Sequence, residues 1–363
     1  MTVLGVRALN RAMLARQSLL ERSKWSVPEA VARLCGVQAQ EPQEPFVGLW
    51  SRLSGFEVGM SDAALTGRAV VRTHLMRRTV HLVAARDALA WRSRHEAMLR
   101  QKVLGVYRSE LAGLDLEEVA RAGREVMSDG CARTMRELAE ALEGRWPAVS
   151  RRALGELVVA ALVPMAQLPP RGLWKVRAGV RILPLETWLG CEVDPPAERG
   201  DPVGRELVRR YLAAFGPATT ADVRAWCGLA GLPAAVRGLE PELVSFRDER
   251  GRRLWDLEQA PRPDPDTPAP VRFLPAFDNA ILGYRDRSRV IDDAHLGLSV
   301  AGRRAVLVDG RAAATWTYGR GWLEVAPLRP LSRVEREEVE AQGWALAGFL
   351  EEGVERVRIL EAG

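Results

Sequence analysis

The chain has 363 residues, of which 47% are hydrophobic and 27% charged, and its formal net charge is +5. This length suggests two or three domains with a sizeable core. No apolar run approaches the about 18 residues that a membrane-spanning helix needs, and the N-terminus has no signal-peptide core, so we expect a cytoplasmic protein without a membrane partner.

Charge and cysteine usage further narrow the possible binding partners and kinds of site. A modest positive charge suits a basic face that meets an anion. Lys24, Lys102 and Lys175 are the only lysines, and this bias toward arginine favours bidentate phosphate contacts but also follows from a GC-rich genome. The cysteines are far apart and form no C-x-x-C pair, which argues against a zinc site and a disulfide framework.

The first elements are helices. We expect one over 10–22, another over 27–35 and a third after Ser61-Asp62. A capping box of Ser26 and Glu29 opens the second helix, and Gly36 is a natural left-handed end for it.

Two glutamines follow this helix. Pro42 and Pro45 oppose a new helix, so Gln38 and Gln40 should lie in extended backbone. Alternate residues of extended backbone point the same way, so both carboxamides should project together into a solvent-filled groove, away from Ala39. On spacing alone the simpler interpretation is a polar edge or a turn, because Q-x-Q is not a motif with a mechanism of its own.

A β-hairpin comes next, with strands over 69–74 and 79–83 joined by a wing at Met76-Arg77-Arg78. Asp87 then caps a long helix. Alternation along the strands places two pairs of side chains on shared faces, which are Arg72 with His74 and Thr79 with His81.

The pattern of helices followed by a strand pair then recurs. Thr134 and Glu137 form a capping box, Ser150 caps a helix that Pro164 ends, and 165–183 should be strand, turn and strand. The next repeat has its own capping box and strand pair, at Thr219 with Asp222 and over 243–247 and 253–257; proline-rich breaks lie at 194–204 and 260–270.

The last part is rich in β-structure. Asp309-Gly310 between the strands 306–308 and 312–316 is a strong hairpin signal, and a capping box of Ser332 and Glu335 opens a final helix over 332–352.

Two aspartates invite an interpretation as catalytic acids. Asp278 precedes Asn279 and reads as a turn residue, and Asp286 between Arg285 and Arg287 is typical of a salt-bridged loop.

Helices followed by a β-hairpin are typical of winged-helix units, which mainly read nucleic acids and also serve as protein–protein modules. We therefore predict an α+β fold of tandem winged-helix motifs. Its parts are a first unit with the glutamines (1–115), a second unit (116–195), a third unit (204–260) and a β-rich part with a hairpin and the final helix (271–363).

Six sequence blocks follow one another along the chain. They are GVQAQEPQEPFVGLWSRL, RTHLMRRTVHLVAARD, PPRGLW, YLAAFGPATTADVRAWCGL, FLPAFDNAILGYRDRSRV, and VDGRAAATW with a PLRPLS ending. In this order they resemble the AlkZ-type winged-helix DNA glycosylases. The family's active-site motif is Gln, an aliphatic or aromatic residue, then Gln or Asp, which Gln38, Ala39 and Gln40 match on the Gln-x-Gln branch.

The resemblance implies a C-shaped monomer that binds duplex DNA, with Gln38 and Gln40 catalytic and no metal or cofactor. It implies a monofunctional DNA glycosylase that removes bulky or crosslinked N7-alkylpurines, unhooks interstrand crosslinks and confers self-resistance to a DNA-alkylating antibiotic. The alternative is a non-catalytic winged-helix DNA-binding regulator, which would usually dimerise on a palindrome.

Several side chains are then expected to contact DNA. The two hairpin histidines either do so or, more simply, hold strand ends by hydrogen bonds, and an arginine after the Asp309-Gly310 turn should reach into the DNA channel. The full set is Arg72, His74, Arg77, Arg78, His81, Arg151, Arg152, Arg285, Arg287 and Arg311.

Overall fold

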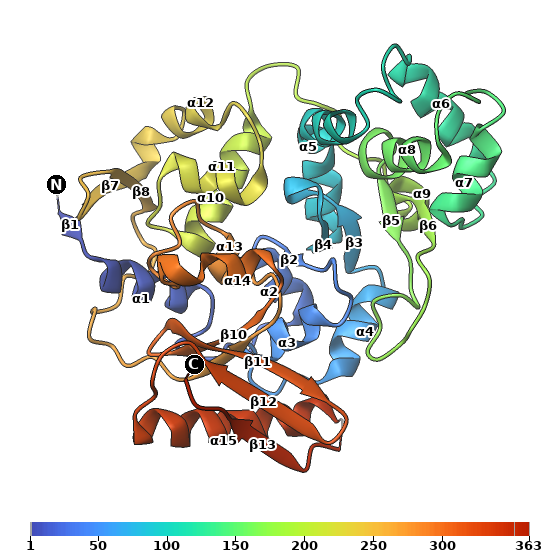
Figure 1. The fold of residues 1–363 in the computed structure, drawn as a ribbon. Coiled ribbons are helices and arrows are strands. Elements are labelled where there is room, and N and C mark those ends of the chain that lie inside the picture. The colour runs from blue at the N-terminus through green and yellow to red at the C-terminus, as the bar shows by residue number, and fades with distance from the viewer. Residues whose placement is uncertain (1, 352, 363) are drawn as a thin grey trace.

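The structure is a computed structural model that describes residues 2–351 and 353–362. It is a mixed α+β fold with three sheets (Figure 1). Among the described residues, none of the helices combines the length and apolar character that a bilayer crossing needs.

The first part of the chain contains the predicted helices and hairpin, together with elements that the sequence did not indicate. Ser26 accepts a hydrogen bond from the Glu29 backbone N–H and Gly36 has a φ of +85°, as predicted, but the Glu29 carboxylate binds Arg33 and does not complete the capping box. The elements are β1 (Val3–Leu4), α1 (Val6–Arg16), α2 (Val27–Arg33), β2 (Val37–Gln38), α3 (Glu44–Trp50), α4 (Val58–Thr66), β3 (Val70–His74), η1 (Met76–Arg78), β4 (Val80–Ala84) and α5 (Ala85–Val106).

Three expectations for this part were wrong. The first helix begins at Val6 and ends at Arg16, shortly before Ser18 adopts a φ of +54°. Helix α3 forms where prolines seemed to oppose it, because Pro45 stands in the first turn and its missing N–H costs no bond there. Asp87 lies inside the first turn of α5 and binds Arg210 instead of capping the helix.

The second part confirms its predicted caps. Thr134 and Glu137 form the capping box, and Ser150 accepts from the backbone N–H of Ala153. The elements are α6 (Leu116–Val126), α7 (Met135–Leu142), α8 (Arg151–Glu156), the π-helical η2 (Leu157–Leu162), β5 (Met165–Gln167), β6 (Ile182–Pro184) and α9 (Leu185–Leu189).

The third part confirms the capping box of Thr219 and Asp222 and both predicted strands. The preceding break is shorter than expected, because Asp201 caps a helix that begins at Pro202. The elements are α10 (Pro202–Phe215), α11 (Thr220–Cys227), α12 (Leu232–Arg237), η3 (Glu240–Glu242), β7 (Leu243–Asp248) and β8 (Arg253–Leu257).

The C-terminal part forms a sheet in the order β13-β12-β11-β10-β9 with α15 packed against it. The hairpin at Asp309-Gly310 and the capping box of Ser332 and Glu335 are confirmed. The elements are β9 (Arg272–Leu274), α13 (Asn279–Leu282), η4 (Asp293–His295), α14 (Leu296–Val300), β10 (Arg304–Val308), β11 (Arg311–Gly319), β12 (Trp322–Pro327), α15 (Arg333–Leu350) and β13 (Arg356–Ile359).

Two strand pairings cross the predicted divisions of the chain. One sheet runs β2-β4-β3-β5-β6, so it joins the first part to the second, and the Thr73 hydroxyl donates to the Met165 carbonyl across that join at 2.8 Å. Strand β1 pairs in parallel with β7 of the third part. The four divisions thus rest on sequence patterns and stay predictions.

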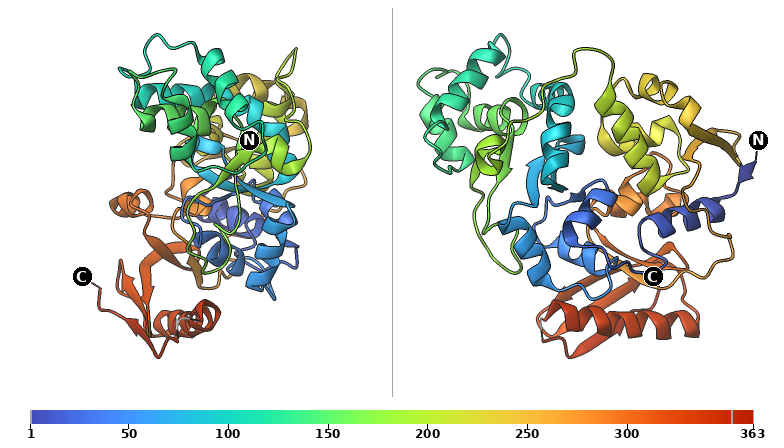
Figure 2. Two further views of the ribbon diagram at one scale, coloured as in Figure 1. Left: turned by 90° about the vertical axis from the view of Figure 1, so that its right-hand side faces the viewer. Right: turned by 180° about the vertical axis from the view of Figure 1, so that it is seen from behind.

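The parts surround the sheet that carries the glutamines. In the left view of Figure 2, helices α6–α8 and the C-terminal sheet with α15 project toward the same side of the molecule. The largest hydrophobic core links α1 and α5 to the second and third parts, with Trp91 and Trp226 buried in it.

Candidate active site around Gln38 and Gln40

Residues 37–44, the glutamine segment, leave β2 along the edge of strand β4. Gln38 pairs with His81 in antiparallel register, and the Ala39 N–H donates to the Val80 carbonyl at 2.8 Å. The Val80 N–H in turn donates to Gln40 Oε1 at 3.1 Å. Gln40 is exposed, whereas Gln38 is only 8% exposed. The expectation that both side chains face a solvent-filled groove is therefore wrong for Gln38.

The carboxamide of Gln38 is held by Arg77. Arg77 Nη2 donates to Gln38 Oε1 at 2.8 Å and to Asn279 Oδ1 at 3.1 Å, and Nη1 donates to the Trp226 carbonyl. Arg77 has a φ of +55°, which turns its side chain from the hairpin tip into the protein. Burial lowers the pKa of Arg77 to about 10, so the guanidinium remains cationic at neutral pH. We expected a phosphate contact here and find instead a side chain that orients a glutamine.

A small cavity of about 20 Å³ is lined in part by Gln38. This volume is enough for about one water molecule. Arg52 and Asp278 line it and form a buried ion pair with N–O distances of 2.7 and 2.9 Å. Asp278 also accepts from the Ala280 N–H, which confirms its role as a turn and cap residue.

Arg72 supports the glutamine segment from within the sheet. It is 2% exposed, and its Nη2 donates to the Ala39 carbonyl at 2.9 Å and to Gln167 Oε1 at 3.3 Å. A Cβ at Gly172, whose φ is +95°, would lie 2.6 Å from Arg72 Cδ, so this position requires glycine. Burial lowers the pKa of Arg72 to about 10.

Gln43 and Glu44 anchor the far end of the segment, and the sequence did not single them out. Gln43 Nε2 donates to the Leu173 carbonyl at 3.0 Å, and Gln43 Oε1 accepts from the Lys175 N–H at 2.7 Å. The Glu44 carboxylate accepts from Arg304 Nε at 3.0 Å and from the Ala276 N–H at 2.6 Å. The segment is thus fixed to the β5–β6 loop and to the C-terminal sheet.

The hairpin histidines are neutral. His81 is fully buried, with Nδ1 3.0 Å from the Thr79 carbonyl, and burial lowers its pKa to about 3. Burial, assisted by Arg92 and Arg78, lowers the pKa of His74 to about 4. His81 matches the structural interpretation, and neither ring carries the charge that would attract a phosphate at neutral pH.

The remaining arginines expected at DNA have varied surroundings. Arg78 pairs with Glu156 at 2.9 Å, Arg151 pairs with Glu140 and Glu143, and Arg287 donates to the Ser299 hydroxyl at 2.9 Å. Arg152 and Arg285 are exposed.

Asp286 lies in the salt-bridged loop that its flanking arginines indicated, but its partners are Arg250 and Arg252. Burial would raise its pKa, and hydrogen bonds from Ser288 and Arg252 outweigh burial and bring the pKa to about 2.

The Asp309-Gly310 turn packs on α1. Asn10 Nδ2 donates to the Gly310 carbonyl at 2.8 Å, and Arg7 and Arg11 bind the Asp309 carboxylate. Arg311 donates to the Ser288 carbonyl at 2.6 Å and pairs with Asp292. The turn and Arg311 are thus held by other parts of the protein, and contact of Arg311 with DNA stays a prediction.

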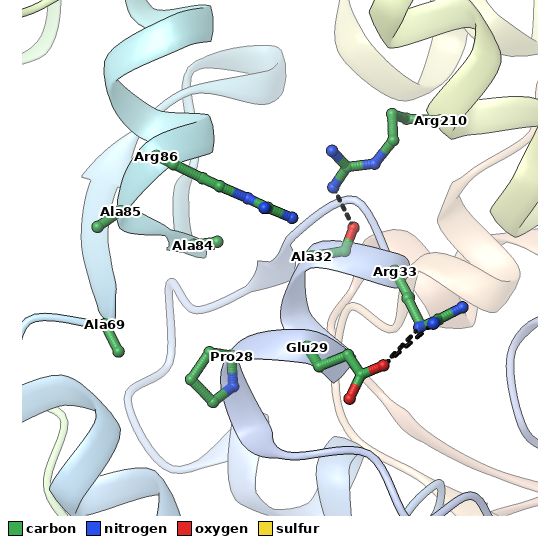
Figure 3. A pocket seen from close by; sticks show the side chains of 9 residues that line it. All are labelled: Pro28, Glu29, Ala32, Arg33, Ala69, Ala84, Ala85, Arg86 and Arg210. Atoms are coloured by element: carbon green, nitrogen blue, oxygen red, sulfur yellow. Dashed lines mark hydrogen bonds and ion pairs between the residues drawn. The ribbon is translucent and has the colours of Figure 1, made fainter.

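A larger cavity, of about 680 Å³, lies elsewhere (Figure 3). It opens between α2, α10 and the start of α5, at the opposite end of β4 from Gln40. Figure 3 shows Arg86 extending across it, while Arg33 binds Glu29 and Arg210 donates to the Ala32 carbonyl. None of the residues expected at the site lines this cavity.

Comparison with known proteins gives a matching family and a similar fold. A family model described as DNA glycosylase AlkZ-like matches residues 31–349. The fold is similar to that of Streptomyces sahachiroi DNA glycosylase AlkZ, with a TM-score of 0.78 and 22% sequence identity, covering 99% of this chain and 100% of that chain. No curated protein gives a significant match.

Proposed function

This chain belongs to the AlkZ-like DNA glycosylase family and is a DNA glycosylase, and from that premise we propose that it is monofunctional and excises bulky or crosslinked N7-alkylpurines from duplex DNA. We propose Gln38 and Gln40 as its catalytic residues. The observation that carries this proposal is the support of both carboxamides: Arg77 holds one and the Val80 N–H holds the other.

The leaving group explains how two neutral amides suffice. Glycosidic cleavage passes through a transition state with positive charge on the sugar. An N7-alkylated purine is already cationic and leaves as a neutral base, so no acid is needed to protonate it. The enzyme must still place a water and stabilise the developing charge, and oriented carbonyl dipoles in a protected site do both. Undamaged purines lack this leaving group and are spared.

The two glutamines divide this work. Gln38 Oε1 already accepts from the cationic Arg77, which opposes further positive charge beside it, so Gln38 mainly orients the attacking water. Gln40 is exposed, and its carbonyl oxygen keeps a second lone pair beside the bond from Val80. Gln40 can therefore also accept from the water, and its dipole is the one available to stabilise the positive charge on the sugar.

Incubation with duplex DNA that contains one N7-methylguanine tests this function. We expect free N7-methylguanine and an abasic site without strand cleavage, and loss of both products in Gln40→Ala. Undamaged duplex serves as the control. Release of base at the wild-type rate by Gln38→Ala and Gln40→Ala together would place the active site elsewhere.

We further propose that the enzyme unhooks interstrand crosslinks, as a cytoplasmic monomer, and protects its host from a DNA-alkylating antibiotic. A duplex crosslinked between two N7 positions should migrate as separate strands in a denaturing gel after treatment. Survival of a sensitive bacterium should rise with the wild-type gene and stay unchanged with the Gln40→Ala gene.

A further inference from the structure

A cavity of about 220 Å³ lies beside the glutamine segment and has no role in the chemistry described above. Its walls come from Gln43, three residues after Gln40, from the β5–β6 loop and from β11. Figure 1 shows that loop reaching down toward the C-terminal sheet. The lining residues are Gln43, Trp174, Lys175, Val176, Arg177 and Tyr318.

One aromatic wall, Trp174, is fixed in place. Its ring centroid lies 4.9 Å from that of Phe46 and 5.3 Å from that of Phe349. The Gln43 carboxamide binds the backbone on both sides of Trp174, through the Leu173 carbonyl and the Lys175 N–H. This wall is therefore tied directly to the segment that carries Gln40.

The other aromatic wall, Tyr318, is equally supported. Its ring stacks on Trp316 with centroids 5.8 Å apart and planes at 26°, and the Arg304 guanidinium lies 5.0 Å from the ring centroid. Trp316 is locked by a 2.9 Å hydrogen bond from Nε1 to the Leu274 carbonyl. Arg304 also binds Glu44, so the second wall is linked to the glutamine segment as well.

The charge around the cavity selects its occupant. Arg177 and Lys175 are exposed at its edge, where Lys175 Nζ also donates to the Glu351 carbonyl at 3.0 Å, and the described lining of the cavity includes no carboxylate. A cationic alkylated purine is repelled here. A neutral nucleobase stacks well on aromatic rings while cations meet its phosphates, which is how proteins hold unpaired DNA.

We propose that this cavity binds the undamaged base that loses its pair when the duplex opens at the lesion. The ring of this base stacks against Trp174 and Tyr318, and its phosphates face Lys175 and Arg177. The inference deepens the proposed function and rests on it for the nature of the lesion. Opening the duplex at a lesion leaves its partner base without a pair. Stacking that base beside Gln40 holds the opened duplex during excision.

The probe is a duplex with 2-aminopurine opposite a tetrahydrofuran abasic analogue, which the enzyme cannot cleave. Wild-type protein should quench the 2-aminopurine fluorescence by stacking and bind this duplex more tightly than a fully paired one. Tyr318→Ala should lose the quenching and on the order of tenfold in affinity, since one base–aromatic stack contributes about 1–3 kcal/mol. Tyr318→Phe should retain both.

Trp322→Ala is the matched control, because Trp322 is 41% exposed on the adjacent strand and does not line the cavity. Arg177→Ala leaves the packed walls intact and should reduce the slope of log affinity against log salt by about 0.9. Unchanged quenching in Tyr318→Ala, or an equal loss of quenching in Trp322→Ala, overturns the inference. If Tyr318→Ala does not fold, a salt dependence of affinity that is unchanged in Arg177→Ala overturns it. Since the probe needs no excision, failure of the proposed function appears separately as absent base release from N7-methylguanine DNA.

Discussion

Gln38 and Gln40 are neighbours in sequence but differ in what a substitution would disturb. Gln38 is buried and accepts from a cationic guanidinium, whereas Gln40 is exposed and accepts from a single backbone N–H. Truncation of Gln38 leaves one inward-facing N–H of Arg77 without its acceptor, and truncation of Gln40 leaves one N–H that water can reach. Catalytic and structural effects should therefore separate between them.

We expect Gln40→Ala to lower the single-turnover excision rate by about 10²–10³-fold, the usual effect of losing one positioned electrostatic group. DNA affinity and unfolding free energy should change little. Gln38→Ala should also slow excision and in addition destabilise the protein by about 1–3 kcal/mol, because a buried donor loses its partner. The double variant should lose less of the excision rate than the two single losses combined would give, since both amides hold the same water.

Gln40→Asp should retain activity, because a carboxylate oxygen can take over the water. It should also broaden the substrate range, since a charged group depends less on a cationic leaving base. Excision rates on N7-methylguanine and on a neutral adduct measure both effects. An inactive Gln40→Asp that still binds DNA would show that the amide N–H groups are required.

Arg77 provides a second test at the residue scale. If it positions Gln38, Arg77→Met should lower the rate within the bound complex by about 100-fold, the order expected for a misplaced catalytic group, with little change in DNA affinity. Arg78→Ala, which removes only a partly exposed pair with Glu156, is the control. Weaker binding with an unchanged rate in the bound complex would make Arg77 a phosphate contact after all.

Strands β3 and β4 and helix α5 hold three histidines close together, with His81 and His95 fully buried and His74 half-buried. Burial lowers the pKa of His74, His81 and His95 to about 4, 3 and 4, against about 6.5 in an unfolded chain. The folded chain thus binds fewer protons, so its stability is full above about pH 6.5 and falls as pH drops toward 4.

Urea unfolding between pH 7 and pH 4.5 measures this loss. Each histidine should lower the unfolding free energy by about 1.4 kcal/mol per pH unit below pH 6. His95→Gln should reduce the slope of unfolding free energy against pH by the equivalent of about one proton relative to the wild type. A slope that is the same in both proteins would show that His95 titrates normally in the fold.

Elements set by neighbouring residues could be predicted from sequence. The caps at Ser26, Thr134, Ser150, Thr219 and Ser332 each depend on residues within three positions, and all five formed. Contacts between distant segments could not be predicted in this way, and the pairing of β1 with β7 is one example.

The same limit applies to the candidate site, where the local motif could be predicted and the contacts between distant segments could not. The glutamine pair was found through its motif, but the inward turn of Arg77 depends on two residues with a positive φ inside η1, Arg77 and Arg78. The ties of Gln43 to Leu173 and of Glu44 to Arg304 join residues more than a hundred positions apart. Nothing in the local pattern distinguishes them from ordinary polar residues at a helix start.

At the scale of the whole molecule, DNA affinity should fall steeply with salt, because phosphate contacts release counterions. Arg152 is exposed, whereas Arg151 is held by Glu140 and Glu143. Arg152→Ala should therefore reduce the slope of log affinity against log salt by about 0.9, and Arg151→Ala should reduce it less. Affinity that is insensitive to salt would contradict a duplex held by its backbone.

The docking of α1 has a consequence for synthesis on the ribosome. Arg7 and Asn10 bind Asp309 and Gly310, and Leu9 and Met13 are buried in the finished fold. At about 5–20 residues per second, Asp309 and Gly310 leave the ribosome on the order of 15–60 s after α1 does. The N-terminal half of the first helix thus meets these partners only after most of the chain has been made, and until then it is a natural target for chaperones that bind nascent chains.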